Sequence, residues 1–308
     1  MRLRPFNARG VAVACFAICA LLAVQAPALA RQNPRPVLDS APAGVQYGDT
    51  AVVTGHFENG TGDEEITLQK EKDGQWKDLA TKSVNENDRV SYELDDLAKT
   101  ADYRLLWTSP DGTATPSDGR ARIQVAARVK LDVSERDVMS GRSVRLRGSV
   151  LPAVSGREVI LQEKVHGAWR FVTRESVADG RFSYQLDIKR RSKGYRPLRA
   201  IFRGDEKNTE GDDRSFIRVY SRSPATWYGP GFWGQRTACG ERLQKGTLGV
   251  AHRTLPCGTK VSLLYRGRTI TVPVIDRGPY GHHYDWDLTQ ETAERLRFRE
   301  SSTIGVTR

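Results

Sequence analysis

Two aspartates near the C-terminal end of the sequence lie in a stretch rich in aromatic rings. Asp276 and Asp287 stand eleven residues apart within TVPVIDRGPYGHHYDWDLTQETAERL, residues 271–296. Cleavage of a glycosidic bond needs a carboxyl group that protonates the leaving oxygen, and a hydrolase needs a second one as base or nucleophile. One carboxyl group is enough where the sugar's own 6-hydroxyl attacks, because the same group donates and then removes a proton. Both chemistries are open to this stretch.

Each aspartate also has a structural interpretation. Asp276 follows the apolar run VPVI and precedes a turn rich in Gly and Pro, where partial burial raises a carboxyl pKa. It is therefore the first candidate for the acid, but its carboxylate could equally fasten the turn by accepting backbone N–H groups. Asp287 could instead cap a helix predicted at about 290–297, a role that Thr289 could also fill.

Two adjacent histidines could be considered as metal ligands, but their spacing does not favour a metal centre. His282 and His283 are adjacent, so their side chains point apart on a strand or turn. His252 could tune protonation at the site, or be a buried histidine that pairs with a backbone carbonyl. We expect neither a metal ion nor another cofactor.

The first thirty residues are typical of a secretory signal peptide. Three arginines precede an apolar run at 11–24, which ends in the small-residue site Ala28-x-Ala30. The run is shorter than a membrane span, so we expect cleavage after Ala30 and no transmembrane segment thereafter. Cys15 and Cys19 lack the residues that normally precede a lipidated cysteine.

The remaining cysteines and the charge agree with export. Cys239 and Cys257 form an even pair, which predicts a disulfide, whereas a zinc site would need further ligands such as His252. The net charge of +11 indicates anionic surroundings, unless it reflects coding bias alone. For an exported chain these are wall polymers, anionic glycans or lipid head groups, and no nucleic acid.

The body of the chain contains an internal repeat. ITLQKEKDGQWKDLATKSVNENDRVSYELDD (66–96) aligns with VILQEKVHGAWRFVTRESVADGRFSYQLDI (159–188). Alternating apolar and polar residues between turn signals predict antiparallel sandwiches of immunoglobulin type. The shared Trp76 and Trp169 are expected to anchor the strand cores. Nothing in either repeat assembles a catalytic set.

A third segment follows the junction VYSRSPATWYG at 219–229. Strands are predicted at 247–252, 259–265 and 268–276, and the helix at about 290–297 completes a small, mostly β unit. Aromatic residues in it could stack on sugar rings or fill the core. The candidates for sugar contacts are Tyr228, Trp233, Tyr280 and Trp286.

Four blocks of this segment occur in a fixed order: ATWYGPGFWGQRTACGERL, GVAHRTLPCGTKV, VPVIDRGPY and WDLT. Together they resemble the double-psi β-barrel domain of the rare lipoprotein A family, distantly akin to the barwin, expansin and glycoside hydrolase family 45 barrels. The resemblance covers residues 225 to about 306. It implies a six-stranded barrel with a groove for a glycan strand. Active members are lytic transglycosylases that cut peptidoglycan, preferring strands stripped of their peptides.

The resemblance carries four polar groove positions over to Glu241, His252, Asp276 and Asp287. The Asp equivalent to Asp287 lies in the polysaccharide groove of expansin-like barrels, which makes it the second candidate for the acid. One position departs from the family pattern, because Gln244 stands where members usually carry an acidic residue. Leu243 likewise replaces an aromatic residue.

The sequence therefore predicts a mainly β chain, with two Ig-like β-sandwich repeats followed by a C-terminal six-stranded double-psi β-barrel. The expected boundaries are 1–30 for the signal peptide, 31–126 and 127–221 for the sandwiches, and 222–308 for the barrel. Two functions remain open for this exported wall protein: a peptidoglycan lytic transglycosylase, or an expansin-like binder that loosens wall polysaccharide without cleaving it. A protein–protein module fits a groove lined by carboxylates less well.

Overall fold

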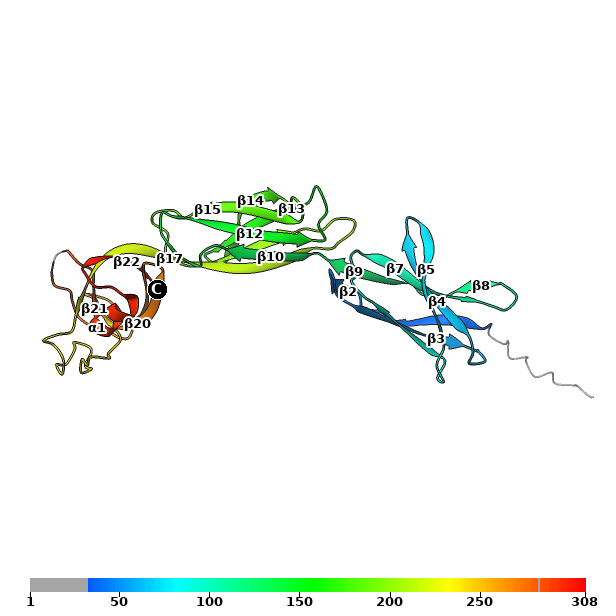
Figure 1. The fold of residues 1–308 in the computed structure, drawn as a ribbon, viewed down its shortest axis with the longest axis horizontal. Coiled ribbons are helices and arrows are strands. Elements are labelled where there is room, and N and C mark those ends of the chain that lie inside the picture. Colours follow the sequence, from blue (N-terminus) through cyan, green and yellow to red (C-terminus); the bar gives the residue numbers. More distant parts are fainter. Residues whose placement is uncertain (1–32, 282) are drawn as a thin grey trace, which may run out of the picture.

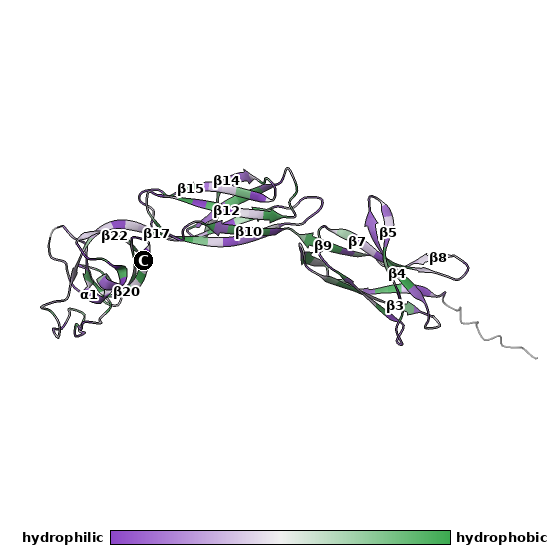
Figure 2. Cartoon of the chain, viewed as in Figure 1, coloured by the Kyte–Doolittle hydropathy of each residue, from purple (hydrophilic) through white to green (hydrophobic). Residues whose placement is uncertain are grey.

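The computed structural model describes residues 33–281 and 283–308. The predicted signal peptide and His282 lie outside the described residues. The described chain forms three β units in a row along the long axis of the molecule (Figure 1). Hydrophobic and hydrophilic residues alternate along the strands (Figure 2), as expected when one face of each sheet is buried. The predicted fold class is confirmed.

The first unit packs two sheets against each other. The smaller sheet has the order β1-β3-β6, and the larger one has the order β2-β9-β7-β4-β5 with β8 paired to β7. In β3 the buried side chains alternate, with Ala51, Val53 and Phe57 facing the core. The strands are β1 (Arg35–Ser40), β2 (Gly44–Gln46), β3 (Ala51–Glu58), β4 (Glu65–Lys72), β5 (Gln75–Ser83), β6 (Arg89–Leu94), β7 (Ala101–Thr108), β8 (Ala114–Pro116) and β9 (Ala121–Ala126).

The second unit repeats this plan. Its smaller sheet has the order β10-β12-β15, and β14-β13-β16-β17 form the larger one with β11 paired to β17. The strands are β10 (Arg128–Val133), β11 (Asp137–Met139), β12 (Ser143–Leu151), β13 (Glu158–Val165), β14 (Ala168–Ser176), β15 (Arg181–Asp187), β16 (Gly194–Phe202) and β17 (Gly211–Tyr228).

The tryptophans shared by the repeats do not anchor the cores, which corrects the expectation for Trp76 and Trp169. Both rings are half-buried, and each lies under an arginine, with Arg104 4.3 Å from the Trp76 ring and Arg199 4.4 Å from the Trp169 ring. A cation–π contact suits a ring at the sheet surface, and it explains why both repeats keep the tryptophan.

The third unit is a closed six-stranded barrel. β17 pairs with both β21 and β22, and the ring continues through β18, β20 and β19 back to β22. The strands are β18 (Val250–Ala251), β19 (Lys260–Tyr265), β20 (Arg268–Asp276), β21 (Trp286–Thr289) and β22 (Ser302–Thr307), and α1 (Gln290–Leu296) is the helix. Thr289 caps α1, since its side chain accepts from the N–H of Thr292.

The second and third units share one strand. β17 runs for 18 residues and pairs with β16 in the sandwich before it pairs with β21 and β22 in the barrel. The stretch read as a junction, 219–229, thus lies mostly inside this strand. Among the described residues, no helix is long and apolar enough to cross a membrane.

Candidate functional site

The barrel places Asp276 and Asp287 on either side of one small residue. Ala251 of β18 lies opposite Asp276 of β20 and also opposite Asp287 of β21. Directly opposed residues of neighbouring strands point to the same face of a sheet. The two carboxyl groups, eleven positions apart in sequence, therefore face one cavity across the alanine.

Asp276 is held by backbone donors. Its Oδ1 accepts hydrogen bonds from the N–H groups of Ala238 and Arg277, both at 2.8 Å. Ala238 precedes Cys239, which forms the predicted disulfide with Cys257 at a Cα–Cα distance of 5.7 Å. The disulfide prediction is confirmed, and the bridge restrains the loop that supplies one of the donors to Asp276.

Asp287 has a contrasting environment. Its Oδ1 is buried and has no hydrogen-bond partner among the described residues. Burial raises the pKa of Asp287 to about 6, and the negative charge of Asp276 adds to that rise. Because Thr289 caps the helix, Asp287 is not occupied as a cap. A carboxyl group in this state can carry a proton near neutral pH and offer it to a ligand.

Tyr228, the last residue of β17, brings a second polar atom without a partner. Its buried hydroxyl makes no hydrogen bond of normal geometry within the described part of the chain, although the Asp276 carboxylate is near enough to affect it. Burial is the main reason that the pKa of Tyr228 is raised, and the carboxylates of Asp276, Asp287 and Glu241 add to the effect. The hydroxyl therefore stays protonated and can donate to a ligand in the cavity.

Around these groups lies a cavity of about 320 Å³. Phe232 and Tyr280 line it and are largely exposed, with Tyr280 at 79%. The Phe232 ring meets Tyr228 edge-on at 6.1 Å. Leu243 forms part of the wall and is almost fully buried. Polar atoms at the base and exposed rings at the mouth match what a sugar requires.

His252 points away from this cavity. Its Nδ1 accepts from the N–H groups of Thr254 at 3.2 Å and Leu255 at 3.1 Å, and its ring lies 4.4 Å from that of Trp286. Burial lowers the pKa of His252, which favours the neutral ring. His252 and Trp286 line a second cavity together with Asp285. The histidine thus accepts from backbone N–H groups rather than donating to a carbonyl.

The other predicted residues lie in different places. Glu241 is exposed in a loop and close enough to influence Tyr228, although it does not line the Asp276–Asp287 cavity. Trp233 is 44% exposed next to Gly229, whereas Trp286 is 6% exposed and packs in the barrel core. The sequence could not separate these two tryptophans, since both lie in aromatic-rich stretches.

Arg253 is a residue that the sequence did not single out. Its guanidinium donates to the carbonyl oxygens of Pro279 at 2.8 Å, Gly281 at 3.0 Å and Tyr284. These carbonyls belong to the loop between β20 and β21, so one side chain holds the loop that joins Asp276 to Asp287. The motif AHRTLP contained the arginine, but nothing local in sequence indicated its partners.

The structure shows no metal centre in the residues it describes. No group of three or more His, Cys, Asp or Glu side chains could hold an ion within 33–281 and 283–308. His283 is exposed, and His282 lies outside the described residues, so the interpretation of the adjacent pair remains a prediction.

Comparison with known proteins identifies the barrel. Residues 221–307 match a family model described as lytic transglycolase. The chain is 44% identical over 97 residues to a probable endolytic peptidoglycan transglycosylase RlpA of Synechocystis sp., covering 31% of this chain and 30% of the relative. It is 42% identical over 84 residues to an endolytic peptidoglycan transglycosylase RlpA of Campylobacter jejuni, covering 27% and 30%. The predicted resemblance to the rare lipoprotein A family is confirmed.

The family model covers the barrel alone, and the chain spans under a third of the length of these two relatives. Among solved structures, a tetra-tandem repeat from the extending region of a large adhesion protein covers 80% of this chain and 63% of that chain. The identity is 14% and the TM-score 0.32.

Proposed function

We propose that the barrel binds glycan strands of peptidoglycan and cleaves them as a lytic transglycosylase. The names of the relatives support the substrate and the reaction class. One observation on this chain carries the proposal: the half-buried carboxyl group of Asp287, whose Oδ1 has no partner and whose pKa is raised to about 6, faces a cavity beside a second carboxylate. That state is what a general acid for glycosidic cleavage requires.

In the proposed reaction, Asp287 is the acid. Its proton passes to the bridging oxygen as the bond from the anomeric carbon to that oxygen breaks. The 6-hydroxyl of the same sugar then attacks the anomeric carbon, and the Asp287 carboxylate takes up the hydroxyl proton. The products are a 1,6-anhydro end and a free hydroxyl on the leaving strand, and the enzyme returns to its starting state.

Asp276 is then the electrostatic partner. Two backbone N–H groups hold its carboxylate in place, and its negative charge faces the anomeric centre as positive charge develops there. Sequence reasoning ranked Asp276 first because it follows an apolar run. The contacts favour the opposite order, since Asp276 already accepts two backbone N–H groups, whereas Oδ1 of Asp287 is buried without a donor.

Substrate contacts follow from the cavity's remaining groups. The Tyr228 hydroxyl is placed to donate to a sugar oxygen, while Phe232, Trp233 and Tyr280 present exposed rings that can stack on neighbouring sugars. His252 becomes a positioning residue, because its ring nitrogen orders the backbone of Thr254 and Leu255.

Binding without cleavage is the alternative function, and Gln244 favours it by standing where the family has an acid. Gln244 is exposed, its N–H donates to Thr247, and it does not line the cavity. Its substitution therefore removes no carboxylate from the Asp276–Asp287 pair, which supports the catalytic proposal.

The experiment uses residues 31–308 with peptide-stripped and with intact wall glycan. Products are analysed by mass spectrometry for 1,6-anhydro ends, and binding is measured by glycan pull-down. We expect anhydro ends from the wild type and none from Asp287→Asn, with pull-down retained. Pull-down without anhydro ends from the wild type would establish the binder instead. Equal release by Asp287→Asn would refute the assignment of the acid.

This function places the protein outside the cytoplasm, at the cell wall. The Cys239–Cys257 disulfide supports that location, because disulfides persist in oxidising compartments. An N-terminal sequence of the mature protein that starts at Arg31 would test the predicted signal cleavage.

A further inference from the structure

Another cavity, lined by apolar side chains and lysines, lies in the first sandwich, far along the chain from the barrel. It has a volume of about 510 Å³ and opens between β5 of one sheet and β6 of the other. Pro152, Lys207 and Asn208 of the second unit close one end of it. Leu68, Leu94 and Leu97 contribute apolar surface.

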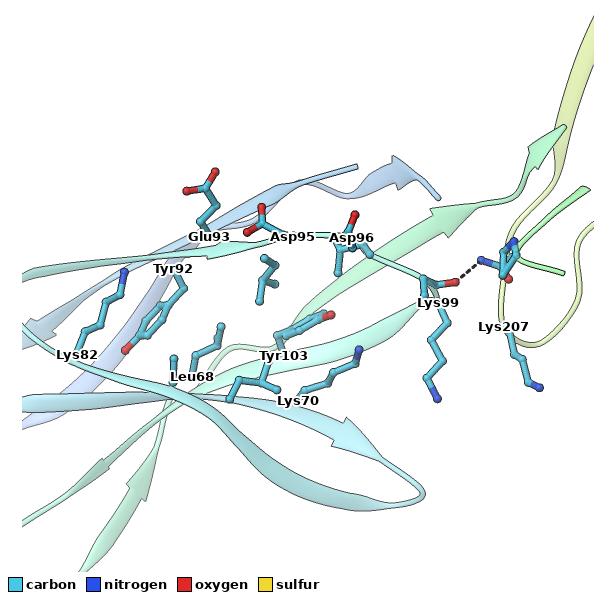
Figure 3. A pocket seen from close by; sticks show the side chains of 17 residues that line it. Leu68, Lys70, Lys82, Tyr92, Glu93, Asp95, Asp96, Lys99, Tyr103 and Lys207 are labelled. Carbon is cyan, nitrogen blue, oxygen red and sulfur yellow. Dashed lines mark hydrogen bonds between the residues drawn. The ribbon is translucent and has the colours of Figure 1, made fainter. Parts of the chain in front are cut away.

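Four lysines line this cavity. Figure 3 shows Lys70, Lys82, Lys99 and Lys207 on one side of the strand that carries Tyr92, whereas the carboxyl groups of Glu93, Asp95 and Asp96 point away from them. In the part of the chain that the structure describes, every ion pair is made by an arginine or a histidine, so these four ammonium groups have no carboxylate within 4.0 Å.

Lys70 is the most constrained of the four. It is half-buried, and its ammonium lies 5.6 Å from the centre of the Tyr103 ring. Burial lowers the pKa of Lys70, and the positive charges of Lys99 and Lys72 lower it further. A lysine gathered with like charges in a partly dry site is stabilised by an anion.

Lys82 and Lys207 also line the cavity. The Lys82 ammonium lies 5.4 Å from the Tyr92 ring and donates to the carbonyl of Ser91 at 2.7 Å, which leaves it further N–H groups. Lys207 belongs to the second unit, and its carbonyl accepts from the N–H of Thr100 at 2.8 Å. The contact between the units therefore holds the backbone of Lys207 at the cavity, while its side chain is exposed.

The second sandwich provides an internal comparison. Glu65 pairs with Ser83 in the first unit as Glu158 pairs with Ser176 in the second, so the strand registers correspond. In this register Glu163 stands at the position of Lys70 and Glu175 at that of Lys82. Glu163 is neutralised by Arg196. The repeat shares its fold, yet the charge is reversed at both positions.

We propose that this cavity binds an acidic saccharide, a sugar segment that carries a carboxylate or a phosphate. The lysines pair with the anionic group, and the apolar surface of Leu68, Leu94 and Leu97 packs against the C–H faces of the ring. An acidic peptide is the competing ligand, and the test includes one. The proposal does not depend on the activity of the barrel.

The test measures affinity by calorimetry for three oligosaccharides of equal length and for one acidic peptide. The oligosaccharides are a hyaluronan tetrasaccharide, a phosphorylated maltotetraose and a neutral chitin tetrasaccharide, and the peptide is poly-glutamate. All proteins carry Asp287→Asn, so that no probe is cleaved. The double variant Lys70→Glu/Lys82→Glu installs the residues of the second unit. The control Lys130→Glu/Lys189→Glu makes the same change in net charge at exposed sites that do not line the cavity.

We expect at least one acidic probe to bind, and the cavity variant to weaken that binding about tenfold or more. The control should change it by no more than about twofold. The probe that binds, carboxylate or phosphate, identifies the anion. Equal losses in both variants would mean non-specific attraction and overturn the proposal. So would binding by poly-glutamate but by neither acidic saccharide, which would indicate a peptide partner.

Misfolding of the double variant is controlled by Lys70→Gln, which keeps the size and removes one charge. It should weaken the same probe by a smaller factor. Unchanged affinity in Lys70→Gln, with the loss confined to a double variant whose unfolding transition has shifted, would also overturn the proposal.

Discussion

Replacing Asp287 with asparagine is expected to stabilise the barrel at neutral and alkaline pH. The pKa of this carboxyl group is about 6 in the folded protein, against an ordinary value of 3.8. Because the folded value is the higher one, Asp287 favours folding most at pH values below about 4, and that contribution is lost as the pH rises through about 6. Above this range, burial of the charge opposes folding.

The magnitude follows from the difference between the two pKa values. About two units at 1.36 kcal/mol each amount to roughly 3 kcal/mol. Asp287 retains some solvent exposure, and screening reduces the figure to about 1–2 kcal/mol. For a unit of this size, that corresponds to a rise in the barrel's Tm of about 5–10 °C at pH 8, with almost no difference at pH 3.5.

The assay is differential scanning calorimetry of wild type and Asp287→Asn from pH 3.5 to 8. The barrel transition is identified as the one that shifts with reductant, since among the described residues only the barrel contains a disulfide. Carbon-13 NMR of the aspartate carboxyl groups titrates Asp287 directly. A variant less stable than the wild type at pH 8, or an Asp287 that titrates near 4, would refute the reasoning.

Four further outcomes test the site. Cleavage should fall about tenfold per pH unit above pH 6, because Asp287 must be protonated; a pH–rate profile flat to pH 8 would contradict this. Asp276→Asn should lower barrel stability by about 1–3 kcal/mol in urea denaturation, since two N–H donors lose a charged acceptor; stabilisation would contradict it. Replacing Cys239 and Cys257 with serine should lower the free energy of unfolding of the barrel by about 3 kcal/mol in the same assay, and an unchanged midpoint would show that the disulfide does not stabilise the barrel. Arg253→Met should make the loop at 279–284 the first site of limited proteolysis, with a raised KM; wild-type resistance would show that its three carbonyl contacts are dispensable.

Local patterns in the sequence predicted most of the architecture. Strands expected at 259–265 and 268–276 correspond to β19 and β20, and the helix expected at about 290–297 corresponds to α1. Alternation and capping are read from neighbouring residues, so one sequence is enough for them. The closed barrel was predicted only from the resemblance of four sequence blocks to a known family, because no local pattern shows that a sheet closes on itself.

The parts that sequence could not predict depend on contacts between distant residues. Trp76 looked like a core residue, because nothing adjacent to it reveals that Arg104 covers its ring. Arg253 looked like any surface arginine, although its three acceptors lie 26 to 31 residues later in the chain. Hydrophobicity and residue spacing do not predict which hydrogen-bond donor contacts which acceptor when the two are distant in sequence.

The two aspartates differ by this same kind of contact. They are the same residue type, and Ala251 of β18 lies opposite both, so their positions relative to β18 do not distinguish them. What separates them is that the loop restrained by the disulfide aims an N–H group at Asp276, while no donor in the described chain reaches Oδ1 of Asp287. Burial without a donor, with the charge of Asp276 beside it, raises the pKa of Asp287 to about 6. On this argument the surroundings and not the residue type select the acid, and Asp276→Asn, which removes the neighbouring charge, should lower the pKa of Asp287 in carbon-13 NMR; an unchanged titration would contradict it.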